Sequence, residues 1–351
     1  MERSPATAAA QGSPPPLGRF VEVQGRRLFV HQSGESGPSI VFLPGAGTVG
    51  LDYIPLQQLG ARLATSIVYD RAGTGWSERV RMPRTLAEAT DELRALLAAL
   101  DAPQPYLLVG HSLGGLYARH YAQRFPGEVA GLLLLDPAHE DFDAYMPTRP
   151  DAAGRARPDK PPNAVLAMVA AAQGRLALRV LAGAVGNRLT RGFVERQPTV
   201  RRYRELYREL FTQEMADWPQ AMRDALVERH VSLDWLLVGL QEAQNVQRLY
   251  REVRAAGPLP DVPMIILCSM QTDAFRRAVD PEASEERRRQ EVDGKRRLYE
   301  VFAASVPRGE VRPVDAGHVT IAYRCAEAAL TAMEDLLGRQ RPRVAAAGAR
   351  S

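Results

Sequence analysis

The feature that most constrains the fold is a short apolar run that leads directly into a glycine-rich turn and a helix. The run Tyr106–Val109 is followed by Gly110–Gly115 (Gly-His-Ser-Leu-Gly-Gly), and helical apolar spacing continues through about Arg124. A second apolar run, Gly131–Leu135, comes after that helix. Continuously apolar strands that alternate with helices are typical of a parallel sheet covered by helices on both faces. We therefore predict an α/β fold.

The rest of the chain supplies further strands on both sides of this unit. Apolar or alternating runs of strand length lie at Phe20–Val23, Arg27–His31, Ser39–Leu43, Ser66–Asp70, Val262–Cys268 and Glu310–Val314. From about 138 to 260 the strand signal is absent and the spacing is helical, so we expect a helical insertion between two sheet strands. The predicted segments are a disordered tail (1–18), a first core part (19–137), a helical cap (138–260), a second core part (261–338) and a disordered tail (339–351).

Composition excludes several classes of protein. The formal net charge is +4, and Lys160 and Lys295 are the only lysines, with arginines spread along the chain rather than gathered in one stripe. This disfavours a nucleic-acid binder. Cys268 and Cys325 form neither a disulfide framework nor a metal-ligand spacing, so we expect no metal site. With no signal-peptide core and no apolar stretch near the roughly 18 residues of a membrane span, we expect a cytoplasmic protein.

Ser112 is the candidate nucleophile. Gly110–Gly114 matches the G-x-S-x-G pattern of a nucleophile elbow, with a buried strand before it and a helix after it. Small residues beside the serine allow the tight turn, and the N-terminus of the following helix favours a developing negative charge.

His318 is the candidate base, because a serine nucleophile needs a general base to accept its proton. Among the six histidines, His318 alone follows a short late strand and precedes the final helix. In a parallel sheet the loops after the strand C-termini gather at one edge, which is where Ser112 is expected.

The chain resembles the α/β-hydrolase superfamily over roughly residues 20–136 and 262–337. The corresponding features are Leu43–Gly47, Tyr69–Gly75, the elbow at Ser112 and Ala316–His318. The resemblance implies the α/β-hydrolase fold, the chain order nucleophile, acid, histidine, and a helical cap inserted after the sixth strand. It also implies that the backbone N–H groups of Ala46 and Leu113 form the oxyanion hole, although Pro44 replaces the histidine that is usual in the family.

Two aspartates remain alternatives for the acid of the triad. Asp273 lies in the loop after Val262–Cys268, the commoner family position, and we give it a small preference. Asp136 ends the strand after the nucleophile's helix, a position that some superfamily members use. Either could instead be structural, Asp273 as a helix N-cap and Asp136 in a turn before Pro137.

The resemblance implies a serine hydrolase that needs no cofactor and cleaves an ester-like bond of a small or medium, hydrophobic substrate through an acyl-enzyme. Haloalkane dehalogenases and epoxide hydrolases are disfavoured, because their elbow carries aspartate where this chain has Ser112. The alternatives are carbon–carbon bond hydrolase, haloperoxidase-like, lyase or thioesterase activity on the same scaffold, or a ligand-binding receptor with vestigial hydrolysis. The sequence predicts neither the oligomeric state nor the physiological substrate.

Overall fold

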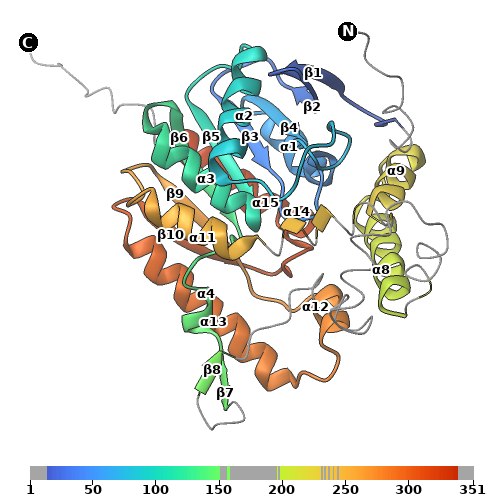
Figure 1. Cartoon of the computed structure of the whole chain (residues 1–351), viewed down its shortest axis with the longest axis vertical. Helices are drawn as coiled ribbons and strands as arrows, with labels where there is room; N and C mark the ends of the chain where they lie inside the picture. The colour runs from blue at the N-terminus through green and yellow to red at the C-terminus, as the bar shows by residue number, and fades with distance from the viewer. Residues whose placement is uncertain are drawn as a thin grey trace, which may run out of the picture.

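The computed structural model describes residues 14–150, 156–158, 196, 198–230, 232, 235, 238–239, 241–242 and 245–338. Eight strands form one sheet in the order β1-β2-β4-β3-β5-β6-β9-β10 (Figure 1). Their bounds are β1 Arg19–Val23, β2 Arg26–Ser33, β3 Ser39–Leu43, β4 Thr65–Tyr69, β5 Tyr106–His111, β6 Val129–Leu135, β9 Met264–Ser269 and β10 Gly309–Val314. Strands β1 and β2 pair antiparallel with their neighbours, and the pairs from β4 through β10 are parallel. The predicted α/β class is confirmed.

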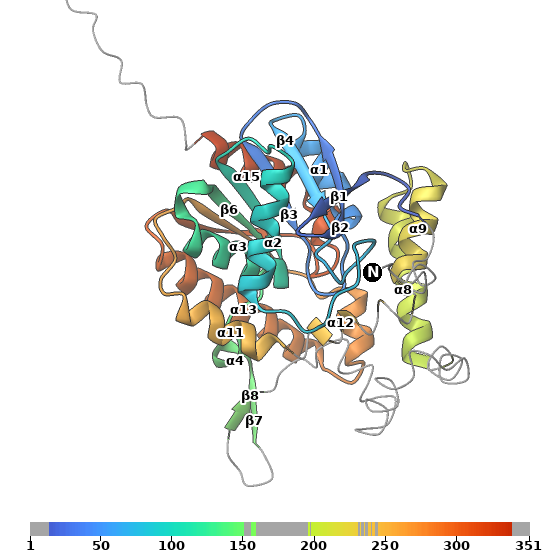
Figure 2. The same cartoon turned by 45° about the horizontal axis from the view of Figure 1, so that its top comes forward.

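Helices cover both faces of this sheet (Figure 2). One face carries α1 (Ile54–Gly60), α14 (Ile321–Arg324) and α15 (Ala326–Gly338). The other carries α2 (Leu86–Ala99), α3 (Leu113–Arg124), α11 (Val246–Ala255) and α13 (Glu285–Ala304). Successive residues of a strand point to opposite faces, so on β5 Leu107 joins the first core and Leu108 the second. Burial on both faces explains why these strands are continuously apolar.

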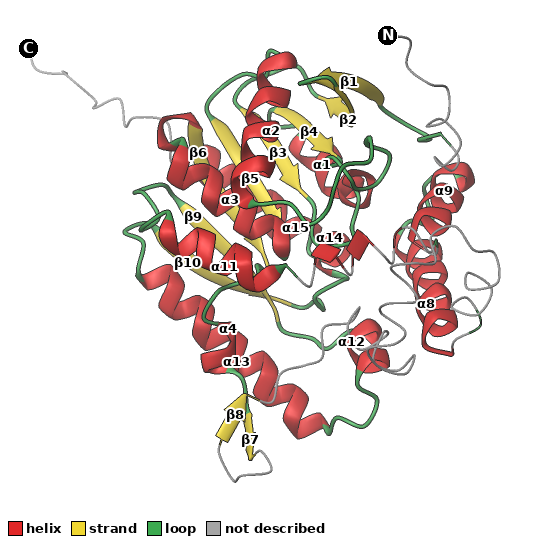
Figure 3. Ribbon diagram, in the orientation of Figure 1, coloured by secondary structure: helices red, strands yellow, loops and turns green. Residues whose placement is uncertain are grey.

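The described residues between β6 and β9 stay outside the eight-stranded sheet. They form α4 (Phe142–Tyr145), α8 (Pro198–Glu214), α9 (Gln220–His230) and α11, together with a two-stranded hairpin of β7 (Thr148–Pro150) and β8 (Ala156–Pro158). Figure 3 shows the hairpin extending away from the sheet, and α8 and α9 lying together beside the sheet. The sequence predicted no strand in this span, so the hairpin is a correction. It pairs only with itself, and a three-residue strand carries too little periodicity to detect.

A buried histidine joins this inserted part to the core. His230, the last residue of α9, contacts both carboxylate oxygens of Asp52 through Nε2, at 2.8 and 2.9 Å. The Tyr207 ring of α8 stacks on the His230 ring with centroids 4.5 Å apart. Asp52 lies in a short 3₁₀ turn, η2 (Gly50–Tyr53), and a second such turn, η3 (Pro126–Glu128), precedes β6. The pairing places α8 and α9 over the loop that follows β3.

Two boundaries differ from those that the sequence predicts. Helix α11 lies within the predicted cap range but packs against α2 and α3, because Leu249 and Val253 join the core on that face. The final helix is divided at Cys325 into α14 and α15. The predicted tails, except for 14–18, and residues 164–185 of the predicted cap lie outside the described residues. In the described part of the chain, no helix is long and apolar enough to cross a membrane.

Candidate functional site

Ser112 occupies a strained turn between β5 and α3. Its backbone angles are φ 50° and ψ −118°, outside the regions that non-glycine residues favour. The turn is crowded: a Cβ atom on Gly114 would lie 1.9 Å from the carbonyl oxygen of Leu43 at the end of β3. Only glycine therefore fits at that position. The strain lifts the serine out of the strand direction and leaves its side chain partly exposed.

His318 lies between Ser112 and Asp136. Its Nε2 is 3.1 Å from Ser112 Oγ, and its Nδ1 is 2.6 Å from Asp136 Oδ2. The His318 side chain is 45% exposed, whereas that of Asp136 is 2% exposed. The three side chains come from the C-terminal ends of β5, β6 and β10, which meet at one edge of the sheet. The His318 ring is thus partly accessible to solvent, whereas the carboxylate that contacts it is shielded from water.

Asp136 is held by several donors besides His318. Its Oδ1 accepts from the backbone N–H of Ser269 at 3.1 Å, and Lys295 Nζ lies 2.8 Å from the same oxygen. Burial alone would raise the pKa of Asp136, but Lys295 and His318 outweigh it and hold that pKa below its usual range. Asp136 is therefore a carboxylate at neutral pH and can accept the Nδ1–H of His318.

Asp273, the acid that the sequence slightly preferred, has other partners. It is the N-cap of α12 (Ala274–Val279), where its Oδ1 accepts from the backbone N–H of Arg276 at 2.9 Å. Its Oδ2 accepts from the backbone N–H of Val319 at 2.7 Å. In this geometry Asp273 fixes the backbone beside His318, whereas Asp136 contacts the His318 ring. The cap role was the alternative that the sequence left open.

The loop after β3 lies against the elbow. A Cβ atom on Gly45 would lie 3.3 Å from the Cβ of Ser112. The N–H of Gly45 donates to Tyr53 Oη at 3.1 Å, and that of Gly47 donates to Glu242 Oε2 at 2.9 Å. Between them, the N–H of Ala46 has no hydrogen-bond partner among the described residues. Leu113, the first residue of α3, also carries an N–H that the helix cannot use. Both predicted oxyanion donors are thus left unpaired beside Ser112.

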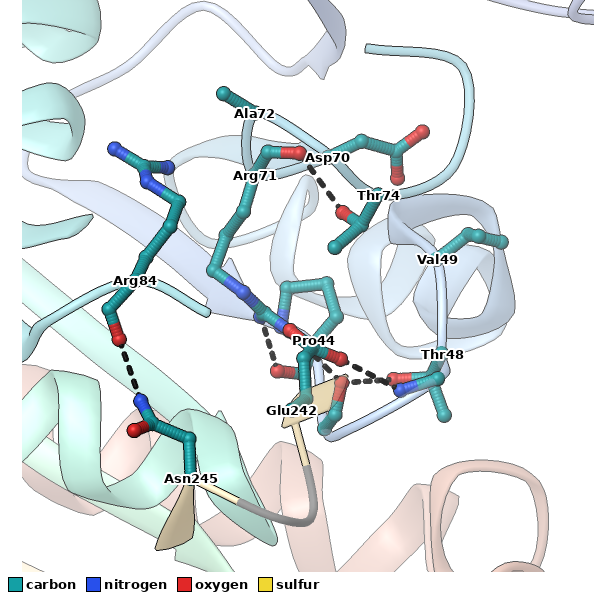
Figure 4. A network of polar contacts seen from close by, with 12 residues as sticks. Pro44, Thr48, Val49, Asp70, Arg71, Ala72, Thr74, Arg84, Glu242 and Asn245 are labelled. Atoms are coloured by element: carbon teal, nitrogen blue, oxygen red, sulfur yellow. Dashed lines mark hydrogen bonds and ion pairs between the residues drawn. The ribbon is translucent and has the colours of Figure 1, made fainter. Parts of the chain in front are cut away.

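Arg71 and Glu242 bind this loop and each other, as Figure 4 shows. The two side chains form an ion pair of 2.7 Å and are each 3% exposed. Arg71 also donates to the carbonyl oxygens of Pro44 and Gly45, at 2.5 and 3.0 Å. Glu242 belongs to the insertion between β6 and β9, so one buried carboxylate links that insertion to the loop of the candidate oxyanion hole.

His111, next to Ser112, is part of a second hydrogen-bonded chain. Its Nε2 lies 2.9 Å from the carbonyl oxygen of His318, which can only accept, so Nε2 carries the proton. Burial and the neighbouring His318 lower the pKa of His111 to about 3, which keeps the ring neutral. Its Nδ1 therefore accepts, and Tyr53 Oη, 2.6 Å away, donates to it. Tyr53 in turn accepts from Gly45, so the chain connects the His318 backbone with the loop after β3.

Sequence reasoning missed three of these contributors. Lys295 was noted only as one of two lysines, and Tyr53 and Glu242 were given no role. Arg71 entered only as part of the segment Tyr69–Gly75. The rarity of lysine in this arginine-rich chain was the one available signal, and it pointed to no partner. Within the described residues, no group of three or more His, Cys, Asp or Glu side chains could hold a metal ion.

The chain is similar in sequence to two proteins from Bacillus subtilis (strain 168). Uncharacterized protein YqjL is 39% identical over 115 residues, which is 33% of this chain and 46% of that protein. Uncharacterized protein YbdG is 30% identical over 122 residues, 34% of this chain and 37% of that protein. The matched part thus spans less than half the length of these relatives.

Solved structures with a similar fold include a thermophilic esterase from Thermogutta terrifontis (TM-score 0.55, 19% identity, 92% of this chain and 98% of that chain). They also include the enol-lactonase from Burkholderia xenovorans LB400 (0.54, 20%, 91% and 100%) and the epoxide hydrolase VrEH1 from Vigna radiata (0.57, 17%, 92% and 98%). A family model described as "Alpha/beta hydrolase family" matches residues 40–320. The chain belongs to the alpha/beta hydrolase family.

Proposed function

We propose that the protein is a serine hydrolase that cleaves an ester-like bond of a small or medium, hydrophobic substrate through an acyl-enzyme. The observation that carries this proposal is the alignment of Ser112 Oγ, His318 and Asp136, with contacts of 3.1 and 2.6 Å. A nucleophile in hydrogen-bond reach of a base, with the base oriented by a third group, is the arrangement that acyl transfer requires.

The first half of the reaction forms the acyl-enzyme. Ser112 Oγ attacks the substrate carbonyl carbon while His318 Nε2 accepts the hydroxyl proton. Asp136 accepts the Nδ1–H bond and stabilises the imidazolium that forms. His318 then returns the proton to the leaving alcohol, and the C–O bond breaks. In the second half, water attacks the acyl carbonyl carbon while His318 Nε2 takes its proton. His318 then gives that proton to Ser112 Oγ as the bond between Oγ and the acyl carbon breaks, which releases the carboxylic acid.

The N–H groups of Ala46 and Leu113 are the proposed oxyanion donors. Neither has a hydrogen-bond partner among the described residues, and they belong to the two segments that approach each other closely at Gly114. In related sites each such donor contributes about 3 kcal/mol to stabilisation of the transition state. Because Gly45 and Gly47 are both tied down by hydrogen bonds, the Ala46 N–H is oriented before substrate arrives.

The helices between β6 and β9 are the proposed cap over this site. Support comes from the contacts of the insertion with the oxyanion loop, since Trp235 Nε1 donates to the carbonyl oxygen of Gly47 and Glu242 accepts from its N–H. Tyr203, Tyr207 and Phe211 of α8 also form an aromatic cluster with Phe275 of α12. Aromatic side chains in the insertion favour a hydrophobic substrate. A serine at the elbow, rather than an aspartate, favours an ester over an epoxide.

A series of p-nitrophenyl esters with increasing acyl length tests the proposal. We expect release of p-nitrophenol with a maximum at short or medium chains and no release by Ser112→Ala. If the purified protein hydrolyses none of the series, and a lactone series also remains intact, the proposed reaction is wrong.

A further inference from the structure

Lys295 reaches from α13 to the same carboxylate that holds His318. Its Nζ lies 2.8 Å from Asp136 Oδ1 and 3.0 Å from Asp136 Oδ2, and it donates to Ser269 Oγ at 2.5 Å. The Lys295 side chain is only 12% exposed. A buried ammonium with three acceptors within hydrogen-bond distance has a fixed position, unlike the many surface cations of this chain.

The choice of lysine here is chemically specific. The protein has 45 lysines and arginines together, of which only Lys160 and Lys295 are lysines, and Lys160 lies outside the described residues. A compact ammonium can direct its three protons to acceptors that converge on one point, whereas a planar guanidinium spreads its donors in a fork. The acceptors around Lys295 converge in this way.

The packing of α13 brings Lys295 to the site. The preceding residue, Gly294, lies so close to α4 that a Cβ atom there would be 2.1 Å from the carbonyl oxygen of Tyr145. This close approach directs Lys295 between the ends of two adjacent strands, where Asp136 follows β6 and Ser269 ends β9. The ammonium therefore bridges the strand of the candidate acid and its neighbour.

We propose that Lys295 is a positioning residue of the triad: it fixes the Asp136 carboxylate toward His318 and limits how strongly that carboxylate favours the imidazolium form. This inference rests on the proposed function, because it assigns Lys295 to the same site. Lys295 touches no reacting atom. It acts on His318 through Asp136.

The sign of the effect follows from the charges. Ser112 can be activated only while His318 is neutral, and the Asp136 carboxylate favours the charged ring. A like charge opposes that charging, and Lys295 lies 2.8 Å from the carboxylate that contacts the ring. Removing the positive charge of Lys295 should therefore change the pH at which labelling of Ser112 is lost.

The other groups around the pair are uncharged or are bound to other partners. His111 of β5 is neutral because its pKa is lowered to about 3, and the carboxylate of Asp273 lies on the backbone of Val319. Burial raises the pKa of Cys268 to about 12 and that of Tyr299 well above its usual value, so both are uncharged at neutral pH. Arg296, the next residue of the helix, is 47% exposed and pairs with Glu300, and Asp315 accepts from Gln271.

The test is the rate of Ser112 labelling by a fluorophosphonate, followed by intact mass across acidic and neutral pH. The acidic limb of this profile is the range over which the labelling rate falls as the pH is lowered. In Lys295→Met we expect this limb to move to higher pH by about one unit or more. Lys295→Arg retains the charge, so its limb should stay near that of the wild type even where its rate falls. Arg296→Met is the matched control, because it removes one positive charge from the next position of the same helix, where the side chain is 47% exposed and pairs with Glu300. Its limb should not move.

Three results would overturn the inference. An unmoved limb in Lys295→Met, with only a lower melting temperature, would show that the lysine merely neutralises a buried charge. A limb that moves equally in Arg296→Met would show a general effect of net charge. If Lys295→Met does not fold, Lys295→Gln, which keeps a donor without the charge, must show the same upward shift, and an unmoved limb there also contradicts the proposal. Failure of the proposed function is seen separately, in wild-type protein that takes no label at any pH, and it would remove this inference as well.

Discussion

Tyr53 Oη donates a hydrogen bond of 2.6 Å to Nδ1 of His111, and His111 immediately precedes the candidate nucleophile Ser112. The same hydroxyl accepts from the N–H of Gly45 in the loop after β3. Because His111 Nε2 donates to the carbonyl oxygen of His318, one neutral imidazole and one phenol connect the elbow, the loop of the candidate oxyanion hole and the backbone of the candidate base.

Replacing this hydroxyl should weaken all three connections. Tyr53→Phe leaves His111 Nδ1 and the Gly45 N–H buried without a partner, at a cost of about 1–3 kcal/mol each in the free energy of unfolding. We expect a lower melting temperature and slower fluorophosphonate labelling. Tyr106→Phe is the control, since among the described residues that hydroxyl has one partner, Gln104 Nε2, which donates to it at 3.3 Å. Equal effects of the two substitutions would contradict the assigned chain.

The two aspartates should separate by rate and stability. Asp136→Asn removes the carboxylate that contacts His318 Nδ1. The same replacement of the triad aspartate in a serine protease lowers the rate about 10⁴-fold. Asp273→Asn weakens an N-cap and should cost about 1 kcal/mol of stability with a smaller effect on rate. Burst kinetics with a p-nitrophenyl ester and urea denaturation of both variants measure this. The reverse pattern would return the acid role to Asp273.

Breaking the buried ion pair should destabilise the loop after β3. Glu242→Gln leaves the charge of Arg71 buried and unpaired, and loss of one partner from such a pair costs about 3–5 kcal/mol in the free energy of unfolding. Glu300→Gln is the control, because its pair with Arg296 is about half exposed and should contribute less than about 1 kcal/mol. Similar unfolding midpoints for both variants would show that Glu242 does not brace the loop.

Crowding at the elbow predicts that alanine at Gly114 destabilises the protein far more than alanine at Gly127 does. Gly114→Ala places a Cβ atom against the Leu43 carbonyl, and such overpacking against backbone costs about 3 kcal/mol or more. Gly127→Ala enters open space and should be close to neutral. Circular dichroism melting of the two variants checks this, and a Gly114→Ala protein as stable as wild type would contradict the close approach of α3 to β3.

The fold could be predicted because its strands are buried on both faces. Ser39–Leu43 was bounded without error, since the apolar run ends at proline and glycine. The short hairpin β7–β8 and the break at Cys325 were not predicted, because segments of three or four residues carry almost no periodicity.

The candidate site was predictable only where the local sequence carries the chemistry. Ser112 lies in a turn whose steric demands fix neighbouring residues, and His318 follows a strand end. The acid was ambiguous because Asp136 and Asp273 both follow strands on the same edge. Their difference lies in distance, since β6 pairs directly with β5, the strand that leads to Ser112, whereas β9 is one strand further away. Lys295 and Glu242 act across long stretches of chain, and no spacing rule connects them with Asp136 or Gly47.

The measurement that tests the central claim most directly is intact-mass spectrometry after treatment with a fluorophosphonate. The account predicts one covalent adduct on the wild-type protein, located on Ser112, and none on Ser112→Ala. An adduct that persists in Ser112→Ala, or a folded wild-type protein that takes no label, would contradict it.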